Sequence, residues 1–126
     1  MAIKTFEGVL DRYPPEVQDL ARKTRRLVLE LLPDAEESVD SSVGVVGYGY
    51  GAGYRGLICT IILSRSGVKL GLSHGAELPD PNGLLQGAGK VHRHVAIMTA
   101  SDLRRPGVKP LLRAAAAAWR RRERRL

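Results

Sequence analysis

Hydrophobic residues that follow Pro14 and Pro15 recur at the spacing of an amphipathic α-helix. The recurring positions share one helix face, and they are Val17, Leu20, Ala21, Thr24, Leu27, Val28 and Leu31. Proline suits the first turn of a helix, and Pro33 together with the restricted residue before it ends this one. The pattern therefore predicts one long helix near the start of the chain, with one apolar and one solvated side.

Several stretches in the middle of the chain have the composition of β-strands. Residues 55–64 are apolar on both faces, as expected of a central strand, whereas apolar and polar positions alternate in residues 68–73. Ser66 and Gly67 mark a turn between them, and so short a connection requires antiparallel pairing. The glycine-rich residues 43–54 are predicted to form bulged or hairpin strands, and residues 95–98 a further short strand.

Helices are predicted at both ends of this strand region. Five consecutive alanines favour a final helix from residue 107 or 109 to about residue 122, and Phe6, Val9 and Leu10 predict a short helical turn near the start. The order predicts one α+β domain over residues 1–126, a two-layer fold with its terminal helices packed on one face of an antiparallel sheet. We expect its core to hold Val17, Leu20, Leu27, Leu31, Ile58, Ile62, Leu70, Leu111 and Trp119.

Composition supports a single globular domain and narrows its class. The chain has 126 residues and an apolar fraction of 44%, enough for one core. The single cysteine, Cys59, lies in an apolar stretch and is expected to be buried in a reducing compartment. No run of 18 apolar residues or long apolar N-terminal segment is present, so we expect a cytoplasmic protein without a signal peptide or membrane partner.

An enzyme is the less expected class. The motif Gly87-Ala88-Gly89-Lys90 suggests a phosphate loop, but Leu84 stands where the first glycine is required and Val91 replaces the final Ser or Thr. No serine lies in a G-x-S-x-G turn, and no array for nucleophilic catalysis is evident. The sequence therefore favours a binding protein, and it leaves any cofactor unidentified.

The segment from residue 71 to residue 94 is the best candidate for a ligand site. It contains five glycines, two prolines and all three histidines, and we expect it to have a defined shape. Alternating tyrosines at 48, 50 and 54 would share one face of a strand, or they could simply cover the open face of the sheet. We predict a groove for a small anionic or planar metabolite, lined by Tyr48, Tyr50, Tyr54, His74, Lys90, Arg93 and His94.

Two groups of residues are candidate metal ligands. Carboxylates could bind a hard cation weakly, or could keep a loop solvated, and the four that lie close in sequence are Asp34, Glu36, Glu37 and Asp40. His92 and His94 are two residues apart, so on a strand they would point the same way and could ligate a metal. Hydrogen bonding of these histidines to loop carbonyls is the alternative.

The formal charge of +7 is concentrated at two places. One basic group is Arg22, Arg25 and Arg26 in the first long helix, and the other is Arg120, Arg121, Arg122, Arg124 and Arg125 at the end. The terminal group is either a solvated helix end or an electrostatic, sequence-independent site for nucleic acid.

Short motifs spread over residues 5–118 resemble one protein family. The motifs are Tyr13-Pro14, Pro33-Asp34-Ala35-Glu36-Glu37, Val46-Gly47-Tyr48, Val68 to Leu72, Gly75-Ala76-Glu77-Leu78-Pro79-Asp80-Pro81, Leu84-Leu85, Gly87, Gly89-Lys90 and Arg93-His94. They resemble the YdhG-like family of small bacterial domains, and the block from residue 75 to residue 94 is the most specific part. The resemblance implies a two-layer α+β fold. Because one relative is described as a frataxin-like iron chaperone, it also implies weak iron binding by the four acids named above.

Overall fold

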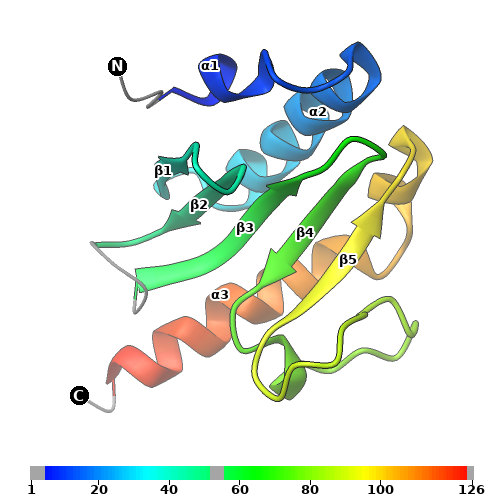
Figure 1. Cartoon of the computed structure of the whole chain (residues 1–126). Coiled ribbons are helices and arrows are strands. Elements are labelled where there is room, and N and C mark those ends of the chain that lie inside the picture. The colour runs from blue at the N-terminus through cyan, green and yellow to red at the C-terminus, as the bar shows by residue number, and fades with distance from the viewer. Residues whose placement is uncertain (1–4, 52–55, 125–126) are drawn as a thin grey trace.

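The computed structural model describes residues 5–51 and 56–124, which form helices and one sheet. The helices are α1 (Phe6–Leu10), α2 (Pro15–Leu31) and α3 (Val108–Arg124), with short 3-10 turns η2 (Gly75–Glu77) and η3 (Ala100–Arg104). The strands are β1 (Glu36–Asp40), β2 (Val45–Gly49), β3 (Leu57–Leu63), β4 (Val68–Leu72) and β5 (Arg93–Ile97). Figure 1 shows α2 and α3 on the same side of the sheet, which confirms the predicted two-layer α+β architecture.

The sheet is antiparallel throughout, in the order β1-β2-β3-β4-β5. Every strand therefore pairs with its neighbours in the chain, and β3 is central, as predicted from its apolar composition. In the part of the chain that the structure describes, no helix is long and apolar enough to span a membrane.

Helix α2 forms where the sequence pattern predicts it. Pro15 occupies its first turn, and the helix ends at Leu31, two residues before Pro33. The apolar stripe is buried except at Leu31, which is half-buried. Its one polar member, Thr24, donates its hydroxyl proton to the carbonyl oxygen of Leu20 at 2.8 Å. The stripe is therefore the surface by which α2 packs against the sheet.

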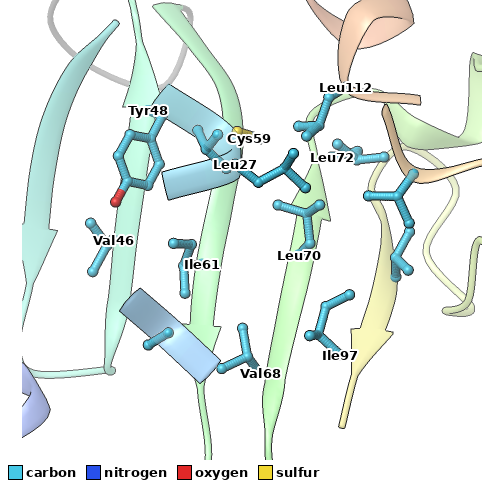
Figure 2. Close-up of a cluster of buried hydrophobic side chains, with 14 of the residues drawn as sticks. Leu27, Val46, Tyr48, Cys59, Ile61, Val68, Leu70, Leu72, Ile97 and Leu112 are labelled. Atoms are coloured by element: carbon cyan, nitrogen blue, oxygen red, sulfur yellow. The ribbon is translucent and has the colours of Figure 1, made fainter. Parts of the chain in front are cut away.

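The strand register separates a helix-covered face from an uncovered one. Val46 pairs with Ile61, and Ile61 with Leu70, so these side chains share the face that packs against the helices. All three are 0–1% exposed, and Figure 2 shows them in the same buried cluster as Leu112 of α3. The alternate positions point the other way, to a face that neither α2 nor α3 covers.

The predicted core is confirmed at most positions and wrong at one. The confirmed residues, each at most 9% exposed, are Val17, Leu20, Leu27, Ile58, Leu70 and Leu111. Leu31 and Trp119 are half-buried and pack against this core. Ile62 lies outside it, because it alternates with Ile61 along β3 and faces the uncovered side. An apolar strand does not reveal which of its two faces a helix covers.

The acidic stretch after α2 is a strand rather than the loop that the sequence suggested. Residues Glu36–Asp40 form β1, at the edge of the sheet, with alternating exposed and half-buried side chains. Charged residues suit an edge strand because they discourage pairing with another molecule. Only Val39 signals a strand there by its own propensity, which is why the pattern predicted a polar connection instead.

Candidate functional site

The uncovered face of the sheet carries a hollow of about 290 Å³ beside the start of β5. We call it the open-face hollow, and its lining residues are Leu57, Thr60, Ile62, Gly71, Leu72, Ser73, His92, Arg93 and His94. Gly71 forms part of its floor. A methyl group at this position would collide with the Thr60 hydroxyl oxygen and would lie 3.3 Å from Cδ1 of Ile62. Because position 71 has no side chain, the side chains of Thr60 and Ile62 extend over it.

A second hollow of about 280 Å³ adjoins the first over β1 and β2. The two hollows share Leu57 and Thr60 among their lining residues. Gly47 lines the second hollow, and it pairs with Thr60, which in turn pairs with Gly71 on the other side. The uncovered face thus has two glycine positions flanking one threonine, with aliphatic side chains at the edges.

The segment between β4 and β5 has the defined shape that its composition predicts. The Asp80 carboxylate accepts hydrogen bonds of 2.9 Å from the backbone N–H groups of Leu84 and Leu85. Gln86 forms an isolated antiparallel bridge with His94, which ties the segment to the outer edge of β5. Gly87 has a φ of 118°, a conformation that favours glycine. These hydrogen bonds fix the position of the first residues of β5, Arg93 and His94, which border the hollow.

His94 is the titratable residue best placed for recognition. It pairs with Gly71 across β4 and β5, so its side chain lies on the uncovered face, where it is half-buried. Desolvation by burial, and secondarily the positive charge of Lys69, lowers the pKa of His94 below its ordinary value of 6.5. The imidazole is therefore neutral at pH 7 and offers one hydrogen-bond donor and one acceptor.

The other two histidines pair with each other instead of converging on His94. Nδ1 of His92 accepts a hydrogen bond of 3.1 Å from the backbone N–H of His74, and the two rings meet edge to face at 5.8 Å between centroids. His74 is the one non-glycine residue with positive φ among the described residues, at 55°. The described residues contain no group of three or more His, Cys, Asp or Glu side chains that could hold a metal ion.

The tyrosine part of the predicted groove is wrong. Tyr48 is 0% exposed and lies within the core cluster of Figure 2, where its hydroxyl donates to Oε2 of Glu37 at 2.6 Å. Tyr50 is half-buried and packs against Trp119 of α3, with 5.0 Å between ring centroids. Tyr54 lies outside the described residues. Tyr48 and Tyr50 share a face as predicted, but it is the face that the helices cover.

The four acids predicted as iron ligands do not come together. Strand alternation sends Glu37 to the helix side, where Oε2 also accepts from Nε of Arg25 at 2.6 Å. Glu36 and Asp40 are exposed on the other face, and Asp40 accepts from the hydroxyl and backbone N–H of Ser42. Asp34 lies in the turn before β1. Glu37, the most buried of the three acids on β1, thus already accepts hydrogen bonds from Arg25 and Tyr48.

The remaining predicted cations lie apart from the hollow. Lys90 is exposed and does not line it. The exposed arginines of the last turns of α3 are Arg120, Arg121 and Arg124, with Arg122 half-buried and Arg125 outside the described residues. On α2, Arg22 pairs with Glu7 and Arg25 with Glu37. Two of the three arginines that the sequence groups on α2 are therefore already engaged in ion pairs.

Sequence reasoning missed the strand residues that line the open-face hollow. Thr60, Ile62 and Gly71 were treated as ordinary strand positions, although a glycine within the alternating pattern of β4 is a signal of close approach or open space. Cys59, in contrast, faces the helices, and burial raises the pKa of its thiol to about 12. The thiol is therefore protonated and enclosed, as the sequence predicted for its burial.

Comparison of the chain with protein-family models, with curated proteins and with solved structures finds no match. The resemblance to the YdhG-like family therefore stays a prediction. The functional argument rests on the geometry of the hollow.

The lowered pKa of His94 predicts a loss of stability on mild acidification. The unfolded chain takes up a proton as the pH falls through about 6.5, whereas folded His94 resists protonation to a lower pH. The contribution of His94 to the free energy of unfolding is complete above about pH 6.5. It is lost as the pH falls toward the pKa that His94 has in the folded protein. Urea unfolding of the wild type and His94→Gln between about pH 7 and about pH 5 should show a steeper decline for the wild type. If the free energy of unfolding declined equally with falling pH in both proteins, the claim that burial desolvates the imidazole would be wrong.

Proposed function

We propose that this protein is a small-molecule binding domain and that the open-face hollow is its site. The observation that carries the proposal is a depression edged by Leu57 and Ile62 on a sheet face that neither α2 nor α3 covers. Antiparallel sheets commonly leave one face to water, and polar side chains then occupy that face. Here Leu57 and Ile62 stand half-exposed beside the polar Thr60 and His94. Apolar surface at the edge of a concave floor is the usual composition of a ligand site.

The lining residues favour a small planar ligand with one anionic group. The side chains of Leu57 and Ile62 reach over Gly47 and Gly71, and they would offer apolar contacts to the flat body of such a ligand. At the β5 end, the neutral imidazole of His94 offers a hydrogen-bond donor to a carboxylate or a phosphate. Arg93, whose Nη1 donates to the carbonyl oxygen of His92 at 3.1 Å, also borders the hollow and contributes positive charge. A volume of about 290 Å³, with the neighbouring hollow adjoining, holds a molecule of metabolite size.

A thermal-shift screen of planar carboxylates and phosphate esters tests this proposal. A ligand at ten times its Kd should stabilise the fold by about 1.4 kcal/mol. For a domain of this size the corresponding rise in Tm is about 4–6 °C. The variant Ile62→Trp should abolish this shift, because the indole fills the hollow on a face where no helix opposes it.

A matched variant distinguishes the hollow from general electrostatic attraction. Lys90→Gln removes an exposed cation from the neighbouring loop without touching the hollow, so it should leave the shift unchanged. His94→Phe keeps an aromatic ring at this position and removes its polar atoms, so it should lower the affinity for an anionic ligand by about tenfold. The proposal fails if no compound stabilises the protein, or if Ile62→Trp retains the full shift.

A further inference from the structure

A second candidate site is a cavity on the helix side of the molecule, on the other side of the sheet from the open-face hollow. Its volume is about 580 Å³, and its walls come from α2, from η3 with the turn after it, and from the first turn of α3. Figure 1 shows how these segments meet: the chain leaves β5, turns behind the sheet and enters α3. We call this cavity the helix-side cleft.

Cations dominate the walls of the helix-side cleft. Its basic lining residues are Lys23, Arg26, Arg104, Arg105 and Lys109, and Glu30 is the one acid among its lining residues. Lys23 and Arg26 precede the other three by nearly eighty residues or more. They come together only because α2 packs against η3 and α3, so no sequence motif predicts the cluster.

Intramolecular ion pairs neutralise only part of this charge. Lys23 is paired with Asp19 at 2.9 Å, and Arg105 with Asp102 at 2.7 Å. Lys109 lies 3.9 Å from Glu30, at the outer limit of an ion pair.

Two cations of the cleft take part in none of these ion pairs. Arg26 of α2 and Arg104 of η3 form no ion pair with any described residue, and both side chains are exposed. Cations held near one another repel, and an anion placed between them relieves that repulsion.

The floor of the cleft is apolar, which strengthens any charge interaction above it. Leu27 and Leu103, each 9% exposed, line the cavity together with Pro106. A cleft with one sign of charge and low-dielectric walls concentrates the field on a bound ion. The first turn of α3 adds the positive end of the dipole of a 17-residue helix.

We infer that the helix-side cleft binds a small, multiply phosphorylated molecule. Guanidinium groups recognise phosphate oxygens through paired hydrogen bonds, and Arg26 and Arg104 reach the cleft from two different walls. Several phosphates on one molecule would meet both arginines at once. A small molecule fits better than a nucleic acid, because these cations converge on a cavity instead of following a stripe along the surface.

Titration with inorganic triphosphate, followed by isothermal calorimetry at about 150 mM salt, tests the inference. We expect one site per chain, and the double variant Arg26→Gln/Arg104→Gln should weaken binding by about tenfold or more. The control Arg120→Gln/Arg121→Gln removes the same charge from exposed positions on α3 outside the cleft. It should change the affinity by less than about twofold.

Three results would overturn the inference. One is the absence of triphosphate binding at about millimolar concentration. Another is equal weakening by the two double variants, which would indicate bulk charge instead of a site. The third is displacement of triphosphate by a single-stranded oligonucleotide at the same phosphate concentration, which would assign the cations to nucleic acid. Far-UV circular dichroism of each variant verifies that the fold is intact, and none of these outcomes depends on the open-face hollow.

Discussion

Ile61→Ala should lower the free energy of unfolding by about 2–5 kcal/mol, whereas Ile62→Ala should lower it by about 1 kcal/mol or less. Ile61 is 0% exposed beneath the helices, and its truncation leaves a cavity between β3 and the helix layer. Ile62 is the next residue on the same strand, but its side chain reaches the uncovered face. The two substitutions remove the same atoms and the same β-branched propensity, so the difference between them measures burial alone.

Urea denaturation of the two variants is the appropriate measurement, with an unchanged m-value as evidence that both remain two-state. A domain of this size has about 5–15 kcal/mol of stability in total, so Ile61→Ala should remove a substantial share. Equal losses for the two variants would mean that both faces of β3 are covered. The open-face hollow would then not exist, and the proposed function would fail with it.

Glu37→Ala should lower the free energy of unfolding by about 1–3 kcal/mol. The carboxylate accepts from the Tyr48 hydroxyl at 2.6 Å and from Nε and Nη2 of Arg25 at 2.6 and 3.2 Å. Tyr48 is wholly buried, so removing the acceptor leaves its hydroxyl without a partner in the core. Burial, followed by the hydrogen bond to Glu37, raises the pKa of Tyr48 well above its ordinary value of 10.0, so the phenol stays a donor.

Glu36→Ala is the matched control for this prediction. Glu36 precedes Glu37 on β1 but is exposed on the opposite face, so its loss should change stability by less than about 0.5 kcal/mol. In a Tyr48→Phe background, Glu37→Ala should cost less than in the wild type, because no buried hydroxyl is orphaned. Equal costs in the two backgrounds would show that the tyrosine does not depend on Glu37.

The helices and central strands were predictable because their residues repeat at a regular period. In α2 the apolar stripe is flanked by prolines at both ends, and in β4 three apolar positions alternate with smaller or charged ones. Each of these signals is local, so it does not depend on how the rest of the chain packs. The two-layer arrangement followed from the order of these elements and from the short connections between strands.

The candidate sites were only partly predictable, because they depend on which face of the sheet the helices cover. Alternation places Tyr48 and Tyr50 on one face of the sheet, but only the packed structure shows that this face is buried. The same alternation divides Glu36 from Glu37, which a count of nearby acids does not reveal. In the helix-side cleft, Arg26 and Arg104 are joined solely by the tertiary fold.

Amide chemical-shift mapping of a compound that stabilises the protein tests the central claim most directly. The account predicts that the largest changes fall on Thr60, Gly71 and His94 around the open-face hollow, and that Ile62→Trp removes them. Residues of the helix layer, such as Leu112, should change little, because the sheet separates them from the ligand. Changes centred on α2 and α3, with none at Gly71, would contradict the claim that the uncovered sheet face is the binding site.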